Sequence, residues 1–266
     1  MIGQERLQSQ MRKLIRGNAL PNFFLLWGDS GQGKRTLAKL IAEQLKAELY
    51  IPADLKVDAV RAIIKDSVTL SKKRVYLLGN AKGMTRQAQN AILKLAEEPP
   101  NNAYIILTIE QKEDVLPTIL SRASTFELDR YTKEEISQST DNPFLQRLCS
   151  NPGQVEYFLS VGYEALIVLS TKVIDNIGKI SGANTFNILK TVKPEEYEAF
   201  VMILIHELGV RLQECKTGAD CMVYARIIDT VFRFGSQLEN KSVNKQNALE
   251  MMLIEARGVA SWTSTS

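Results

Sequence analysis

The chain has 266 residues, of which 45% are hydrophobic and 24% are charged, and its net charge is +3. This length accommodates two domains and a small third module, while the charge is too small to indicate nucleic-acid binding by itself. No apolar run approaches the roughly 20 residues that a membrane span needs, and the N-terminal segment lacks the apolar core of a secretory signal.

Alternating strands and helices are predicted as far as residue 128. Apolar runs that favour buried strands cover 23–27, 48–52, 74–78, 103–109 and 123–128, the last at a sheet edge. Amphipathic helices are predicted between them, over 34–48, 57–70 and 85–98, and Pro99 and Pro100 end the third. Repeated strand–helix units indicate an α/β fold, with a parallel sheet that carries helices on both faces.

Beyond residue 128 the strand pattern gives way to helices with short loops. Apolar residues recur at helical spacing over 132–139, 142–149, 153–174, 195–215, 218–240 and 241–260. We therefore predict an all-α region after the α/β domain. The expected domains are an α/β domain over 1–128, a small helical domain over 129–166 and a C-terminal helical bundle over 167–262.

A glycine-rich loop follows the first predicted strand. Gly28, Gly33 and Lys34 fit the first seven positions of G-x-x-x-x-G-K-[ST], and Gly31 adds a further glycine. Such a loop presents backbone N–H groups to phosphate oxygens at a helix start, and the lysine reaches the outer phosphates.

The eighth position of this motif is Arg35, where a Ser or Thr hydroxyl would bind Mg²⁺. Thr36 is a candidate phosphate contact but cannot simply take that place, because one residue along a helix rotates the side chain by about 100°. ATP or ADP bound without hydrolysis and an empty loop both stay open.

The third strand also lacks the acidic residues that a nucleotide hydrolase needs at its end. Gly79 and Asn80 stand where an Asp would hold Mg²⁺ and a Glu would align the attacking water. Removing one general base typically slows a reaction by about 10²–10⁴-fold. Hydrolysis by this chain alone is therefore not expected.

The segment 73–128 resembles the AAA+ core of DNA polymerase III clamp-loader subunits, and is most similar to the bacterial delta-prime type. In that family the strand leads into A-x-x-M-T-x-x-A-x-N-A-L-L-K-x-L-E-E-P-P and later into P-T-I-L-S-R. This chain reads AKGMTRQAQNAILKLAEEPP over 81–100, with Leu95 displaced by one position, and PTILSR over 117–122. The resemblance extends over about residues 1–165. It implies an AAA+ domain, a helical lid and a C-terminal collar through which subunits assemble.

Several departures from the family affect its chemistry. The segment 48–73 contains no cysteine, so the four-cysteine zinc module of many delta-prime subunits is absent and no metal is expected. The first sensor position falls on Thr108 or, as the better fit, Ile109, and the second sensor arginine is replaced by Gln154. The resemblance therefore implies a subunit that does not hydrolyse ATP.

Arg122 is the catalytic residue that the resemblance implies, acting in trans on nucleotide bound by a neighbouring subunit. Such an arginine finger can accelerate hydrolysis by about 10³–10⁵-fold. The alternative is a surface arginine that caps a helix or pairs with Glu127. The family also implies that the helices flanking the third strand line a DNA path, with Arg61, Lys65 and Arg86 as candidate phosphate contacts.

Together these features predict a non-hydrolysing clamp-loader subunit that helps place the sliding clamp on primed DNA. Its implied partners are gamma/tau-type and delta-type subunits in a hetero-oligomer. A stand-alone P-loop ATPase or a DNA-dependent switch protein is the alternative. Cys149, Cys215 and Cys221 have no metal-ligand spacing, and their odd number argues against a disulfide framework. We expect reduced thiols in a cytoplasmic protein that does not bind membranes.

Overall fold

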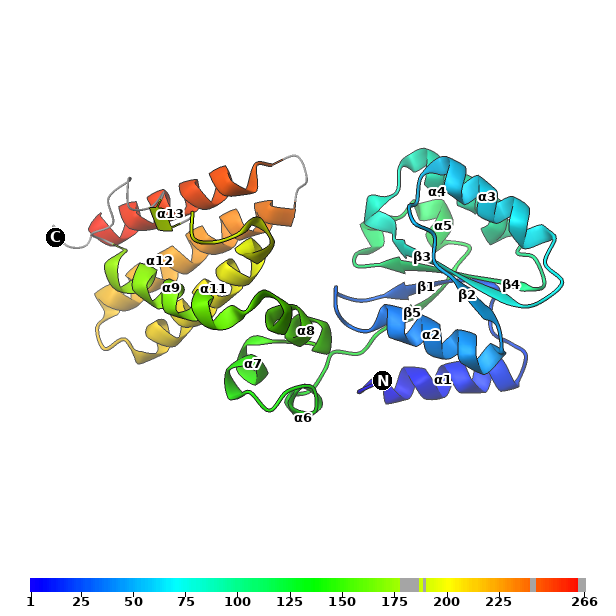
Figure 1. Cartoon of the computed structure of the whole chain (residues 1–266), viewed down its shortest axis with the longest axis horizontal. Helices are drawn as coiled ribbons and strands as arrows, with labels where there is room; N and C mark the ends of the chain where they lie inside the picture. Colours follow the sequence, from blue (N-terminus) through cyan, green and yellow to red (C-terminus); the bar gives the residue numbers. More distant parts are fainter. Residues whose placement is uncertain (178–186, 189, 240–242, 263–266) are drawn as a thin grey trace. The chain divides into compact units, whose positions relative to one another are not determined.

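The computed structural model describes residues 1–177, 187–188, 190–239 and 243–262. The chain divides into two compact units, Met1–Gln154 and Val155–Ser266. Figure 1 shows that the first unit contains the sheet and that the second is helical. The predicted α/β plus all-α fold class is confirmed, while the division into three domains stays a prediction.

Five parallel strands form one sheet in the order β2-β3-β4-β1-β5. They are β1 (Phe23–Trp27), β2 (Glu48–Tyr50), β3 (Arg74–Asn80), β4 (Ala103–Ile109) and β5 (Ser124–Glu127). All five were predicted, with β5 at the edge as expected. β3 continues past its apolar run into Gly79 and Asn80, where its pairing with β4 shifts register.

Alternate side chains of the strands fill two separate cores, one on each face of the sheet. One core lies against α1 (Glu5–Arg16) and α2 (Lys34–Leu45), and contains Phe24 and Leu26 of β1. The other lies against α3 (Val57–Val68), α4 (Arg86–Glu97) and α5 (Pro117–Leu120), and contains Phe23 and Leu25. Figure 1 shows these helices on opposite sides of the sheet. Burial on both faces explains why the central strands β1, β3 and β4 read as apolar runs.

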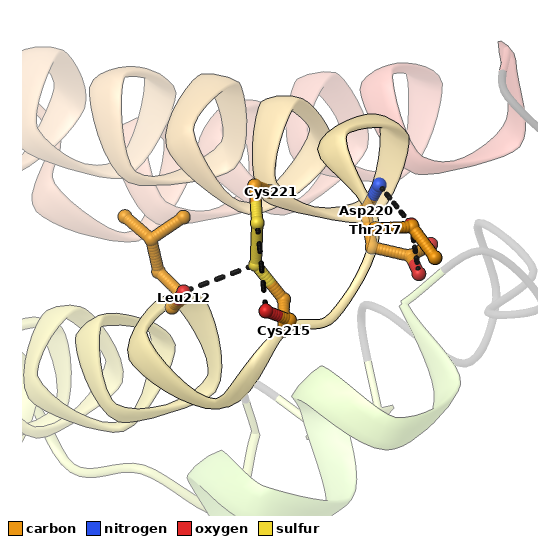
Figure 2. The surroundings of a disulfide bond; sticks show 5 residues. All are labelled: Leu212, Cys215, Thr217, Asp220 and Cys221. Atoms are coloured by element: carbon orange, nitrogen blue, oxygen red, sulfur yellow. Dashed lines mark hydrogen bonds between the residues drawn. A yellow bond between two sulfur atoms is a disulfide. The ribbon is translucent and has the colours of Figure 1, made fainter.

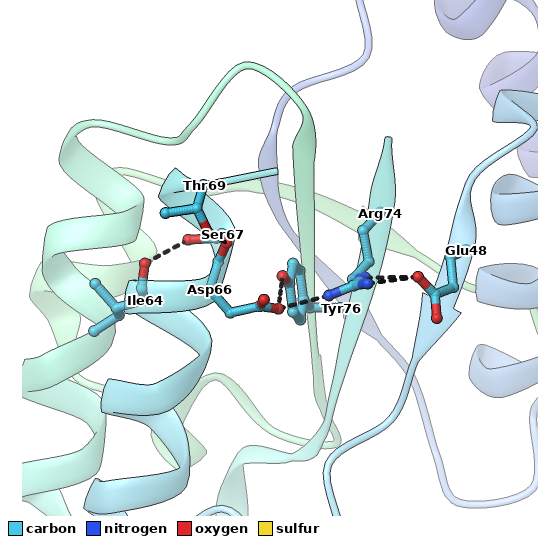
Figure 3. Close-up of polar contacts among 7 residues, drawn as sticks. All are labelled: Glu48, Ile64, Asp66, Ser67, Thr69, Arg74 and Tyr76. Atoms are coloured by element: carbon cyan, nitrogen blue, oxygen red, sulfur yellow. Dashed lines mark hydrogen bonds and ion pairs between the residues drawn. The ribbon is translucent and has the colours of Figure 1, made fainter. Parts of the chain in front are cut away.

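A polar cluster fastens the β2 edge of the sheet to α3 (Figure 3). The Arg74 guanidinium donates to Glu48 Oε2 and to Asp66 Oδ2, both at 2.6 Å. The Tyr76 side chain is buried, and its hydroxyl donates to the same Asp66 oxygen at 2.5 Å. Burial and this hydrogen bond raise the pKa of Tyr76 to about 12. The cluster therefore supports the short strand β2 with side chains from two other elements.

The helical part of the chain contains seven α-helices within the described residues: α6 (Lys133–Ser137), α7 (Pro143–Leu148), α8 (Pro152–Val161), α9 (Tyr163–Asn176), α11 (Tyr197–Glu214), α12 (Gly218–Gly235) and α13 (Lys245–Trp262). Residues 153–174 are helical as predicted, and Gly162 divides them into α8 and α9 with φ +69°, a conformation that favours glycine. Residues 240–242, where one predicted helix ends and the next begins, lie outside the described residues.

Short 3₁₀ segments complete the fold: η1 (Ala81–Gly83), η2 (Lys112–Asp114), η3 (Pro194–Glu196) and η4 (Ser236–Glu239). In the second unit, α11 packs against both α9 and α12, and α12 packs against α13. Within the described part of the chain no single helix is long and apolar enough to cross a membrane. The bent pair α8 and α9 meets that criterion only when taken together, as core helices can.

Candidate functional site

The phosphate-loop motif lies where its chemistry requires, between the end of β1 and the start of α2. Gly31 has φ +81° and Gly33 has φ +93°, the left-handed region that glycine adopts without strain. Arg35 and Thr36 are exposed on the first turn of α2. The sequence therefore predicted both the position of the loop and the glycines that its backbone needs.

Side chains of the loop form hydrogen bonds with several of the loop's own backbone N–H and carbonyl groups. The Asp29 N–H donates to the buried Gln32 Oε1 at 2.7 Å. The Lys34 ammonium donates to the carbonyl oxygens of Gly28 and, at 2.8 Å, of Asp29. Burial lowers the pKa of Lys34, although the Glu110, Asp29 and Asp114 carboxylates act in the opposite direction. A phosphate group has to displace these contacts to enter the loop.

The start of α8 covers the loop at very short range. Asn151 is 1% exposed, and its Nδ2 donates to the Ser30 carbonyl at 3.1 Å. The Gly153 N–H donates to the Gly31 carbonyl at 3.2 Å. A Cβ at Gly31 would lie 2.3 Å from Asn151 Oδ1, so side chains are excluded at this contact. Sequence reasoning missed Asn151, because its partner lies 121 residues away.

Gln154, at the predicted second sensor position, turns its side chain back toward its own helix start. Its Oε1 accepts from the Ser150 N–H at 2.7 Å and from the Ser150 hydroxyl at 3.0 Å. These two hydrogen bonds fix the amide at the N-terminus of α8. Gln154 therefore serves as a local cap in this structure.

The chain after β5 contacts both the N-terminal segment and the same loop, which the sequence did not predict. Gln4 is 3% exposed, and its amide both donates to the Asp129 carbonyl and accepts from the Asp129 N–H, the latter at 2.7 Å. The Arg6 guanidinium pairs with the Asp129 carboxylate at 2.6 Å. Further along, the Tyr131 hydroxyl donates to the Gln32 carbonyl at 3.0 Å.

The ends of β3 and β4 bring an amide and a carboxylate together. Asn80 Nδ2 donates to Glu110 Oε1 at 2.8 Å, and Asn80 Oδ1 accepts from the Lys82 N–H at 3.0 Å. Thr108 and Ile109 are both buried within β4. The polar group at this end of β4 is therefore Glu110, which sequence reasoning passed over because it follows the apolar run.

Arg122 lies at the C-terminal end of α5, 40% exposed. Its Nε is 3.1 Å from Glu97 Oε1 in an ion pair with the last residue of α4. Its Nη1 donates to the Thr118 carbonyl at 3.1 Å and to Ser121 Oγ at 3.4 Å. The helix-capping part of the alternative predicted from the sequence is confirmed, because Nη1 donates to a carbonyl of the last turn of α5. The predicted pairing with Glu127 is wrong, because the acidic side chain that Arg122 contacts is Glu97.

The basic residues proposed as DNA contacts lie on α3 and α4. Arg61, Lys65 and Arg86 are all exposed, and Arg61 Nη1 is 3.5 Å from Asp58 Oδ1 on the same helix. Arg61 also lines a groove of about 710 Å³ between the two helices. The other lining residues are Val57, Ile64, Gln87, Asn90, Ala91 and Lys94. Lys65 and Arg86 are not among them, whereas Lys94, which the sequence analysis did not select, is.

The expectation of reduced thiols is wrong for two of the three cysteines. Cys215 and Cys221 form a disulfide across the turn from α11 to α12, with their Cα atoms 5.7 Å apart (Figure 2). The turn between two packed helices brings them together. Cys149 is free and buried, and burial raises the pKa of its thiol to about 11. Within the described ranges no group of three or more His, Cys, Asp or Glu residues could hold a metal ion.

Comparison with known proteins adds family information to this geometry. Residues 52–132 match the family model described as "DNA polymerase III, delta subunit". The gamma subunit of DNA polymerase III from Buchnera aphidicola (Schizaphis graminum) is 28% identical over 166 residues, which cover 51% of this chain and 46% of that protein. The tau subunit from Escherichia coli K12 is 22% identical over 247 residues, covering 80% of this chain and 38% of that one. This chain thus spans less than half the length of either relative.

A solved structure shares the fold. It is a DNA polymerase III gamma subunit-related protein from Thermotoga maritima, with a TM-score of 0.58 and 19% sequence identity. The match covers 94% of this chain and 99% of the other. At this identity the likeness shows a common architecture, which extends through the second, helical unit.

Proposed function

Because this chain belongs to the family of DNA polymerase III delta and gamma/tau clamp-loader subunits, we propose that it is a non-hydrolysing subunit of such an assembly. It helps load the sliding clamp onto primed DNA, and it donates Arg122 to nucleotide bound by a neighbouring subunit. The observation that carries this proposal is the contrast between an exposed guanidinium and a phosphate loop that lacks its catalytic partners.

The residues around the loop do not fit a catalytic magnesium ion. Arg35 replaces the hydroxyl ligand, and the end of β3 supplies Gly79 and Asn80 instead of carboxylates. The Lys34 ammonium already donates to two carbonyl groups of its own loop. ATP or ADP is therefore proposed only as a ligand that the loop holds without hydrolysis.

Arg122 has the properties that a residue acting in trans requires. A guanidinium keeps its positive charge at any physiological pH, and its planar fork matches phosphate oxygens. It stabilises the charge that develops on a transferred phosphoryl group without any proton transfer. Since Arg122 lies on the surface of the first unit, a neighbouring subunit can approach it.

The second unit is the proposed collar through which the chain joins gamma/tau-type and delta-type partners. Large apolar side chains remain exposed on its helices, namely Met222 and Phe232 on α12 and Met251 and Ile254 on α13, with exposures of 59%, 67%, 48% and 46%. Exposed apolar side chains on neighbouring helices favour contact with other helices. The groove between α3 and α4 is the proposed contact for DNA phosphates, through Arg61 and Lys94.

ATP turnover by the purified chain and by a complex reconstituted with gamma/tau-type and delta-type subunits tests the proposal. The chain alone should show no turnover above background, with or without DNA. In the complex, Arg122→Ala should lower DNA- and clamp-stimulated turnover by about tenfold or more without loss of assembly. Wild-type turnover by an assembled Arg122→Ala complex would show that Arg122 is only a structural residue.

The alternative function, a stand-alone ATPase, gains support from the Glu110 carboxylate beside Asn80. A carboxylate at this edge of the sheet is a potential base for water. Steady turnover by the chain alone that disappears in both Lys34→Ala and Glu110→Gln would favour this alternative. Turnover that survives both changes would indicate a contaminating enzyme.

A further inference from the structure

Two of the three guanidinium nitrogens of Arg122 have contacts within the described residues. Nε faces Glu97 Oε1 at 3.1 Å, and Nη1 donates to Thr118 O and Ser121 Oγ. An arginine side chain carries five N–H groups, two of them on Nη2. Within the part of the chain that the structure describes, Nη2 has no partner. The guanidinium is therefore held through Nε and Nη1, and Nη2 is open to an external acceptor.

We infer that Glu97 is a positioning residue for Arg122, which fixes the guanidinium plane so that Nη2 faces the neighbour's phosphate. This inference rests on the proposed function of Arg122 in trans. Without the Glu97 contact, the long arginine side chain would be held only by Nη1 at the end of α5. A carboxylate at Nε adds a second fixed point and so defines the orientation of the plane.

Glu97 can act as a fixed point because α4 is firmly attached to the segment that carries Arg122. Gln89 of α4 is 6% exposed, and both the nitrogen and the oxygen of its side-chain amide form hydrogen bonds with the backbone that precedes α5. Its Nε2 donates to the Asp114 carbonyl at 2.9 Å, and its Oε1 accepts from the Leu116 N–H at 2.8 Å. Ile119 of α5 is fully buried in the same core as α4. Glu97 and Arg122 thus lie on two helices whose separation is set by buried contacts.

Stability does not account for this ion pair. The side chains are 40% and 52% exposed, and exposed pairs typically contribute about 0–1 kcal/mol. The carboxylate also reduces the net charge that Arg122 offers to a phosphate, so its benefit has to come from orientation. Orientation can therefore be tested by comparing Glu97→Ala, which removes the contact with Arg122, with Glu97→Gln, which keeps a side chain of the same shape.

The test uses the reconstituted complex with Glu97→Ala, Glu97→Gln and, as a matched control, Glu98→Ala. Glu98 is the next residue, also exposed, and has no ion pair within the described residues. Glu97→Ala should lower the kcat of stimulated ATP turnover by about tenfold, less than the roughly 10²-fold that a 1 Å misplacement can cost, with KM and assembly unchanged. Glu97→Gln should retain most activity, since an amide of the same shape keeps an oxygen beside Nε, and Glu98→Ala should match the wild type.

Two further results separate this inference from the function on which it rests. In an Arg122→Ala background, Glu97→Ala should have no additional effect, because the residue it positions is gone. If Arg122→Ala is defective while Glu97→Ala equals Glu98→Ala, the positioning role is refuted and the proposed function stands. Equal defects in Glu97→Ala and Glu97→Gln would also refute orientation as the cause. Wild-type turnover in Arg122→Ala would instead refute the proposed function itself.

Discussion

Gly153 allows the packing of α8 on the phosphate loop to be tested with a single methyl group. A Cβ at this position would lie 2.4 Å from Gly31 Cα and 2.8 Å from Gly31 O. Both are backbone atoms, which cannot rotate away as the end of a flexible side chain can. Gly153→Ala must therefore move the loop and α8 apart and break the 3.2 Å hydrogen bond between Gly153 N–H and Gly31 O.

The expected loss of stability follows from these contacts. Overpacking by one methyl group typically costs about 1–3 kcal/mol, and the lost hydrogen bond adds about 1 kcal/mol. In a domain of about 150 residues, each 1 kcal/mol lowers the melting temperature by about 2–4 °C. The first unit should therefore melt roughly 5–15 °C below the wild type.

Differential scanning calorimetry of the full chain measures this shift. Gly83→Ala, in the same unit, is the matched control, because a Cβ at Gly83 meets nothing within 4 Å. The control should stay within about 1 kcal/mol of the wild type in unfolding free energy. If Gly153→Ala and Gly83→Ala melt together, the close contact between α8 and the loop does not exist in solution.

Three further changes test other parts of the molecule. The Cys215–Cys221 disulfide joins residues separated by 6 positions, and its reduction should lower the unfolding free energy of the second unit by about 2 kcal/mol. A variant with both Cys215→Ser and Cys221→Ser should not respond to reductant. An unchanged unfolding free energy of the reduced wild type would contradict the pairing. Because burial and the Asp66 hydrogen bond raise the pKa of Tyr76 to about 12, above the unfolded value of about 10, its stabilisation is complete below pH 10 and is lost toward pH 12. The unfolding free energy of Tyr76→Phe, measured by urea titration, should therefore converge on that of the wild type over this range, whereas a constant difference would show that the pKa of Tyr76 is not raised in the folded protein. Binding of the complex to primed DNA should weaken with salt, and the slope of log K against log salt concentration should fall in magnitude by about 1 for Lys94→Ala and for Arg61→Ala. Lys39→Ala on α2 should leave this slope unchanged. Equal slopes for all three variants would exclude the groove as the DNA contact.

The central strands of the sheet, β1, β3 and β4, could be predicted because they are buried on both faces. β4 was predicted to the residue, since all seven of its side chains are buried and the run ends where burial ends. β3 was predicted two residues short, because Gly79 and Asn80 are not apolar although they remain in the sheet. Hydrophobic patterning therefore locates buried backbone and fails where a strand extends into a polar edge.

The contacts around the loop could not be predicted in the same way. The glycine pattern specifies the backbone conformation of residues 28–33, but the side chains that cover it come from both ends of the first unit. Gln4 contacts Asp129 across 125 residues of sequence, and Asn151 contacts Ser30 across 121. No local periodicity relates such positions. The disulfide was also missed, because the odd number of cysteines was taken to indicate reduced thiols, although Thr217, a typical helix N-cap, marks a turn between Cys215 and Cys221.

The missing carboxylates at the end of β3 are not a consequence of crowding. A Cβ at Gly79 would meet only Leu55 Cδ1, at 3.8 Å, so this position has room for a side chain. Charge is more informative about the proposal that the loop does not hydrolyse nucleotide. The Lys34 ammonium lies near the Glu110, Asp29 and Asp114 carboxylates and donates to its own loop's carbonyl groups. Its positive charge is therefore already balanced within the unit, whereas Nη2 of Arg122 has no acceptor among the described residues. An ammonium held within its own loop and a guanidinium nitrogen left open at the surface agree with the proposed role of this chain at a neighbour's site.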